Sequence, residues 1–198
     1  MNDTEVIVSR LLEVTQQDIV PLTRDGVRHG NKVFGAAILK KDDLSLVIAG
    51  TNNEIENPLW HGEVHTLKKF YELPASQRAT PRDCIFFATH EPCPLCLSAI
   101  TWGGYDNFYY LFSYEDSRDS FNIPHDLNIL KEVFKCDKGK YAHENYYWTC
   151  HSVQHMINES TTSARERFQL QFDKLKKTYN DMSDVYQKSK GNNDIPLG

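Results

Sequence analysis

The sequence has no long hydrophobic run and no recognisable leader. Crossing a bilayer takes about 20 consecutive apolar residues, whereas the apolar run Ile85–Ala88 is only as long as a strand. The first residues, Met1 to Glu5, contain neither the basic segment nor the apolar core of a signal peptide. These features predict a soluble protein that has no membrane partner and is located in the cytoplasm, with a nuclear location also open.

Positive charge is not in excess either. Lys and Arg number 22 against 27 Asp and Glu, so the formal net charge is -5. A protein that grips several phosphates of DNA or RNA needs clustered basic side chains to displace counterions. Nucleic acid is therefore an unlikely partner, and a small molecule is the expected one.

Cysteine is scarce and unevenly placed. Of the five cysteines, only Cys93 and Cys96 lie close together in the chain. In a reducing compartment a close pair more often binds metal or takes part in catalysis than forms a disulfide. The other three, Cys84, Cys136 and Cys150, are expected to be buried thiols.

Length and hydrophobic pattern predict one α/β domain with terminal extensions. The chain has 198 residues, of which 40% are hydrophobic, and strands alternate with helices between residues 33 and 134. The expected helices span residues 5–20, 61–70, 92–102 and a long segment beyond 158, and the expected strands span 33–39, 44–49, 84–88 and 107–112. This order indicates an antiparallel hairpin followed by parallel crossover units.

The chemistry is carried by two short motifs. His61-Gly62-Glu63 begins one expected helix, and Pro92-Cys93-Pro94-Leu95-Cys96 begins another. One imidazole and two thiolates satisfy three positions of a tetrahedral zinc ion and leave the fourth for water. Zinc bound in this way lowers the pKa of that water toward neutrality. The motifs therefore predict a catalytic zinc site made by His61, Cys93 and Cys96.

Glu63 follows the first ligand by two residues and need not bind the metal itself. A carboxylate there can act as general acid and base, moving protons from the attacking water to a ring nitrogen and then to a leaving amine. The expected reaction replaces an exocyclic amino group by oxygen and releases ammonia.

The two motifs together resemble the zinc signature of the cytidine deaminase-like superfamily, and the resemblance extends over about residues 33–112. It implies a three-layer α/β/α domain with a central mixed five-stranded sheet and added terminal helices, zinc as cofactor, and a homodimer. On this basis residues 1–157 would form the catalytic domain with its N-terminal helix. Residues 158–190 would form a helical extension, and residues 191–198 a disordered tail.

The resemblance does not select one substrate. The stretch His61-Gly62-Glu63-Val64 is similar to fungal-type cytosine deaminases, whereas residues 91–102 are similar to bacterial-type guanine deaminases. The resemblance also implies that Asn52 bonds the base, although the loop before His61 is about two residues short, so Asn53 competes for that role. Phe34 and Trp102 are expected as pocket walls, and Asp116, or Asp119 nearby, as a carboxylate that touches the ligand.

Several alternatives remain open at this level. A structural zinc site could be completed by Cys136, Cys150 or His151. The activity could be of the tRNA adenosine deaminase type or the CMP/dCMP deaminase type. The chain could also be a non-catalytic zinc-binding partner of an active deaminase, although the presence of Glu63 argues against this.

Overall fold

A computed structural model describes residues 3–197. Its sheet has five strands in the order β2-β1-β3-β4-β5, with antiparallel pairing among the first three and parallel pairing from β3 to β5. The strands are β1 (Gly35–Lys40), β2 (Leu46–Thr51), β3 (Cys84–His90), β4 (Asn107–Phe112) and β5 (Thr149–Ser152). The prediction of an α/β fold with a mixed five-stranded sheet is confirmed, although β5 was too short to be identified from the sequence.

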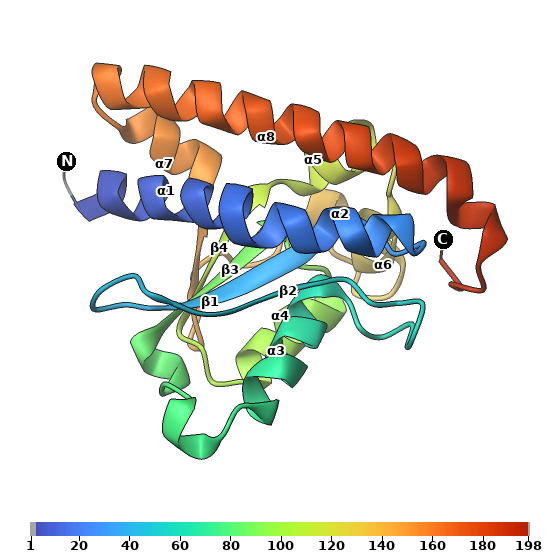
Figure 1. Cartoon of the computed structure of the whole chain (residues 1–198), viewed down its shortest axis with the longest axis horizontal. Helices are drawn as coiled ribbons and strands as arrows, with labels where there is room; N and C mark the ends of the chain where they lie inside the picture. The colour runs from blue at the N-terminus through green and yellow to red at the C-terminus, as the bar shows by residue number, and fades with distance from the viewer. Residues whose placement is uncertain (1–2, 198) are drawn as a thin grey trace.

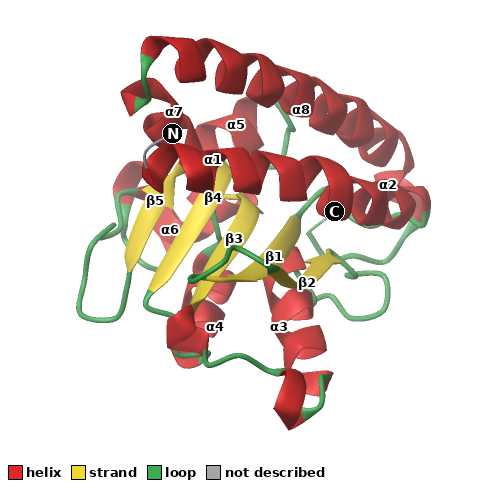
Figure 2. Ribbon diagram, turned by 60° about the vertical axis from the view of Figure 1, so that its left-hand side comes forward, coloured by secondary structure: helices red, strands yellow, loops and turns green. Residues whose placement is uncertain are grey.

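Helices cover both faces of the sheet (Figures 1 and 2). One face carries α1 (Asp3–Val14), α2 (Val20–Arg28), α7 (Val153–Glu159) and α8 (Thr162–Ser189). The opposite face carries α3 (Gly62–Glu72) and α4 (Pro94–Trp102). The short helices α5 (Tyr114–Asp119) and α6 (His125–Glu132) lie in the connection between β4 and β5. The remaining short turns are η2 (Ala75–Gln77), η3 (Pro81–Asp83), η4 (Asp137–Gly139) and η5 (Lys190–Asn192).

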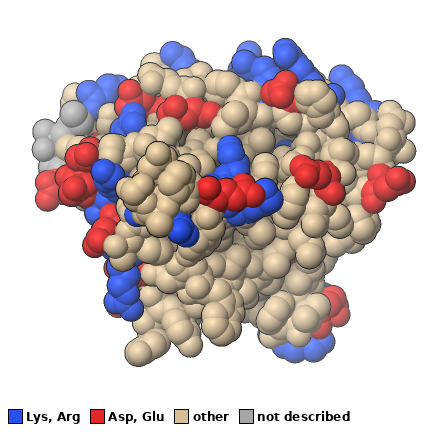
Figure 3. Space-filling view, turned by 60° about the horizontal axis from the view of Figure 1, so that its bottom comes forward, with Lys and Arg blue, Asp and Glu red and all other residues tan. Residues whose placement is uncertain are grey.

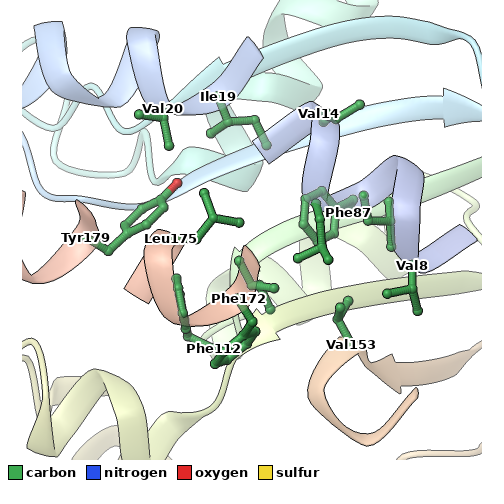
Figure 4. Close-up of a cluster of buried hydrophobic side chains, with 14 of the residues drawn as sticks. Val8, Val14, Ile19, Val20, Phe87, Phe112, Val153, Phe172, Leu175 and Tyr179 are labelled. Carbon is green, nitrogen blue, oxygen red and sulfur yellow. The ribbon is translucent and has the colours of Figure 1, made fainter. Parts of the chain in front are cut away.

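Each face of the sheet has its own apolar core. Side chains alternate along a strand, so in β3 Phe87 packs with the α1 and α8 side while Phe86 packs with the α3 and α4 side. Every residue of β3 is buried, as expected for a strand covered on both faces. Figure 4 shows Phe87 and Phe112 from the sheet in one apolar cluster with Phe172 and Tyr179 from α8, and the Phe112 ring contacts the rings of both α8 residues.

The N-terminal helix runs past Pro21, where the sequence suggested that it would end. Between α1 and α2 the chain forms a π-helical turn, η1 (Thr15–Ile19), and Pro21 sits in the first turn of α2. Because proline lacks a backbone N–H, it is tolerated at such a position, where the hydrogen-bond register changes. The helical path therefore continues to Arg28.

The C-terminal segment is part of the core. Along α8, Phe168, Phe172, Leu175 and Tyr179 recur every three or four residues, and all are buried. Residues 191–197, expected to be disordered, follow α8 as η5 and an extended segment. There Ile195 is buried and Asn193 Nδ2 donates to the Gly30 carbonyl at 3.2 Å. Within residues 3–197, no helix is both long enough and apolar enough to cross a membrane.

Candidate functional site

The two motifs meet because α3 and α4 both begin beside the carboxyl end of β3. His61 is the N-cap of α3 and Cys93 is the N-cap of α4. A Cβ at Gly62 would lie 2.7 Å from backbone atoms of Phe34, so glycine lets the start of α3 pack directly on the chain that leads into β1. The two helix N-termini, whose dipoles favour negative charge, thus converge on one point.

The donor atoms of His61, Cys93 and Cys96 have the spacing of a metal site. His61 Nδ1 lies 3.3 Å from Cys93 Sγ and 3.8 Å from Cys96 Sγ, and the two sulfurs are 3.6 Å apart. Zinc bonds of about 2.3 Å to sulfur and 2.0 Å to nitrogen in a tetrahedron place their donors roughly 3.5 to 3.8 Å apart. The three side chains could therefore hold one zinc ion after only a small adjustment.

The electrostatic environment of the two thiols favours the binding of a cation. Hydrogen bonds from the Cys96 thiol and from His61 hold the pKa of Cys93 well below its usual range. Burial, followed by the hydrogen bond to Cys93 and the charge on Cys93, raises the pKa of Cys96 well above its usual range. One thiolate thus forms readily, and a divalent cation between the sulfurs would stabilise the second.

No further ligand closes the site. Among residues 3–197, the group of His, Cys, Asp and Glu side chains that could hold a metal contains His61, Cys93 and Cys96 alone. Cys150, one candidate for a fourth ligand, is buried and contacts the hydroxyl of Tyr141 at 3.9 Å instead. Three protein ligands with an open fourth position are typical of catalytic rather than structural zinc.

Glu63 lies beside the donors in the first turn of α3 and is 5% exposed. Burial, and then the negative charge of Cys93, raises the pKa of Glu63 to about 7. A carboxyl group with a pKa near neutrality both accepts and returns a proton readily. The side chain is therefore suited to the proton transfers that a hydrolytic reaction needs.

A cavity of about 510 Å³ leads to His61 and Cys93, two of the three side chains that could hold the metal. A small inner pocket continues from it to Glu63, Cys96 and Asp126. The outer walls are mainly apolar, with Phe34, Pro58, Leu59, Leu95, Ile123, Ile129, Phe134, Pro196 and Leu197 among them. A largely apolar slot with a few polar groups at its end matches the surface of a flat heterocycle.

The structure places Phe34 at the cavity as expected, since this ring lines both its parts. Asn52 is fully buried and does not line the cavity; its Nδ2 donates to Glu54 Oε2 at 2.6 Å. The competing Asn53 donates to Glu56 at 2.7 Å, on the exposed side of the loop. The shortened loop thus brings Glu54, rather than either asparagine, to the cavity wall.

Trp102 and Asp116 are not brought to the site. Trp102 ends α4, and eight residues of helical rise put it about 12 Å from the start of that helix; its side chain is 92% exposed. Asp116 caps α5 by accepting from Ser113 N at 3.1 Å, and it accepts from Lys176 Nζ at 2.5 Å. It therefore connects α5 to α8. Asp119 pairs with Arg118 at the surface.

Sequence reasoning missed Asp126. This residue lies in the first turn of α6 and lines both parts of the cavity. Burial, and then the negative charges of Cys93 and Glu63, raises its pKa well above the usual range, whereas a zinc cation held by the two thiolates would favour its ionised form. Within residues 3–197, no side chain donates a hydrogen bond to its carboxyl group, which leaves that group available to a ligand. No spacing in the sequence connects it to the zinc motifs.

Lys32, Glu54 and Glu91 were also missed. Lys32 and Glu54 line the outer cavity, and Glu91 lines the inner pocket. Glu91 accepts hydrogen bonds from Tyr114 N at 3.1 Å and Tyr141 Oη at 2.8 Å, so its carboxylate is committed to neighbouring elements. A buried acidic side chain with such partners is structural in character.

Known proteins share both the motifs and the fold. Residues 13–112 match the family described as the cytidine and deoxycytidylate deaminase zinc-binding region. The protein named guanine deaminase from Bacillus subtilis (strain 168) is 32% identical over 120 residues, which are 59% of this chain and 72% of that protein.

One similar solved structure is a mutant of NE0047 in complex with 8-azaguanine. It is 18% identical to this chain, with a TM-score of 0.51, and the match covers 86% of this chain and 84% of that one. The structure of guanine deaminase from Bacillus subtilis is 27% identical to this chain, with a TM-score of 0.46. The match covers 86% of this chain and 93% of that one. The family model spans half of the chain and contains both zinc motifs. The chain belongs to the cytidine and deoxycytidylate deaminase family.

Proposed function

We propose that this protein deaminates free guanine. Zinc-dependent hydrolytic deamination of a nucleobase follows from the family, and the identity of the base is the proposed part. The observation that carries it is the Asp126 carboxyl group, which lines an apolar cavity together with the residues that could hold the metal. The 32% identity to a protein named guanine deaminase supports the same base.

In the proposed reaction Glu63 moves two protons. Zinc held by His61, Cys93 and Cys96 would supply the Lewis acidity that activates water. Glu63 accepts one proton from the water as its oxygen bonds to C2 of guanine, and it passes this proton to the neighbouring ring nitrogen. It then carries the second proton to the amino group. The C2–N bond breaks, ammonia leaves, and a carbonyl forms at C2.

Asp126 and Phe34 would orient the base. Guanine carries an N1–H donor beside C2, and a carboxylate oxygen is the matching acceptor. The Phe34 ring, which lines both parts of the cavity, offers a flat apolar surface. In the proposed function Asp126 takes the role that the sequence suggested for Asp116.

The direct test is a substrate panel. The purified zinc protein is incubated with guanine, guanosine, cytosine, cytidine, their monophosphates and a tRNA anticodon stem, and released ammonia is measured. We expect guanine to react fastest. Reaction of cytosine alone would refute the purine assignment while leaving the chemistry intact, and reaction of only the tRNA or the monophosphates would refute the assignment to a small neutral substrate.

The alternatives are not favoured. The net charge of -5 offers no general attraction to RNA. A non-catalytic partner subunit would have no need for Glu63, whose buried position and raised pKa suit proton transfer. The apolar walls of the outer cavity do not resemble a phosphate-binding surface.

The protein is further proposed to form a homodimer through the outer face of α4. Leu95, Ser98 and Trp102 share this face, with Leu95 38% and Trp102 92% exposed. Figure 3 turns the α3 and α4 side forward, and the lower centre of that view has few charged side chains. Exposed apolar surface without charge is typical of a protein interface.

Light scattering tests the dimer. We expect the protein to have twice the chain mass of 22.9 kDa, and Trp102→Glu to dissociate it, because a carboxylate would be buried without a partner. Val185→Glu is the control, since Val185 is also exposed but lies on α8, across the sheet. A monomeric parent protein would contradict the proposal.

A further inference from the structure

Glu54 is the centre of a buried polar network beside the metal ligands. Its Oε1 accepts a hydrogen bond from Lys32 Nζ at 3.0 Å, and its Oε2 accepts one from Asn52 Nδ2 at 2.6 Å. The Glu54 N–H donates to Asn52 Oδ1 at 3.2 Å. The side chains of Lys32 and Glu54 are only 6% and 3% exposed. Lysine and glutamate are almost never buried to this degree unless they are paired.

The network reaches the far side of the His61 ring. His61 Nδ1 faces the two sulfurs, while Nε2 lies 3.7 Å from Glu54 Oε1. An imidazole that binds metal through Nδ1 carries its proton on Nε2. The separation exceeds that of a direct hydrogen bond, so the attraction between this N–H and the carboxylate is electrostatic. Within a low-dielectric interior such an attraction is weakly screened.

We propose that Glu54 is a positioning residue, which holds His61 with Nδ1 directed at the zinc site while Lys32 and Asn52 hold Glu54. The inference rests on the zinc-dependent function proposed above but not on which base is the substrate. It also explains why the fully buried Asn52 has no surface on the cavity: its amide supports the carboxylate instead of meeting the ligand.

Lys32 has a separate role in this arrangement. A carboxylate buried without a countercharge is strongly unfavourable, so the pairing of Lys32 with Glu54 at 3.0 Å holds Glu54 in place. Removing Lys32 alone leaves that charge unpaired, whereas removing both charges together restores neutrality. The two effects, stability of the fold and orientation of His61, can therefore be measured apart.

The experiment compares Glu54→Gln, Lys32→Met and the double variant with the parent protein. Zinc affinity is measured by competition with a chromogenic chelator, and the zinc-free proteins are unfolded in urea. Loss of a group that supports a metal-binding histidine typically weakens metal affinity about 10- to 100-fold, which is the result expected for Glu54→Gln and for the double variant. Lys32→Met is expected to lower the urea midpoint more than the double variant does.

A spectroscopic measurement separates positioning from general destabilisation. Cobalt(II) in place of zinc reports ligand geometry through its absorption spectrum, and we expect Glu54→Gln to change that spectrum. Glu56→Gln is the matched control, because Glu56 is exposed in the same loop and its carboxylate accepts a hydrogen bond from Asn53 Nδ2 at 2.7 Å. It should keep both the parent spectrum and the parent zinc affinity.

The proposal would be overturned if Glu54→Gln behaved like the parent protein. That result would be a zinc affinity within about threefold of the parent value and an unchanged cobalt spectrum. If Glu54→Gln alone does not fold, the double variant decides in the same way. Guanine deamination is not a readout here, so a negative result in the substrate panel leaves this test unaffected.

Discussion

Replacing Glu63 by glutamine is expected to lower kcat by at least about 10² to 10⁴, the usual contribution of general acid and base catalysis. Glutamine has nearly the same shape as glutamate but neither accepts nor returns a proton at neutral pH. Because Glu63 is not among the three metal donors, the variant should still bind zinc. Steady-state kinetics with the best substrate of the panel, together with metal analysis, measures both quantities.

Glu72→Gln provides the control for this substitution. Glu72 lies in the last turn of the same helix, α3, where it pairs with Lys68 at 2.6 Å on the surface. It should retain parent kinetics. A Glu63→Gln protein that keeps near-normal turnover would disprove the proton-transfer role, whereas loss of zinc would point to a structural effect instead.

Asp126→Asn is expected to reduce kcat/KM for guanine by at least about 10²-fold. A hydrogen bond to a charged group contributes roughly 1.5 to 3 kcal/mol, and a bound base can donate more than one to a carboxylate. The amide keeps the size of the side chain but loses the charge and one acceptor oxygen. Initial rates over a range of guanine concentrations separate KM from kcat, and the loss should appear in KM at least in part.

Asp119→Asn is the matched control for Asp126→Asn. Asp119 ends α5, is exposed and pairs with Arg118 at 2.6 Å, away from the cavity. Its variant should behave as the parent protein does. If Asp126→Asn deaminated guanine with parent kcat/KM, the carboxylate would not bind the base, and the case for guanine would depend on sequence identity alone.

The zinc motifs could be predicted because their geometry is local. His61 and Glu63 are two residues apart at the start of one helix, and Cys93 and Cys96 are three apart at the start of another. Helical spacing directs Cys93 and Cys96 to one side of α4. His61 and Glu63 are instead close because one is the N-cap of α3 and the other lies in its first turn. The alternation of strands and helices was likewise sufficient for an α/β sheet with an antiparallel hairpin and parallel crossovers.

The polar groups that line the cavity could not be predicted in this way. Asp126 reaches the cavity because α6 packs against α4. Asp116 lies away from the cavity because its carboxylate accepts a hydrogen bond from Lys176 on α8. Both outcomes depend on contacts between segments distant in the chain. A family resemblance placed Trp102 at the pocket, yet the length of α4 carries it to the surface.

The sequence by itself determined the fold class and pointed to the three side chains that could hold a metal, since these depend on short-range periodicity and on spacing within each of two short motifs. Tertiary structure alone decided which carboxylates line the cavity and which support the protein. The reason is physical: a buried carboxylate is defined by its partners, and Lys32 with Glu54, Tyr141 with Glu91 and Lys176 with Asp116 are partners only after the chain has folded.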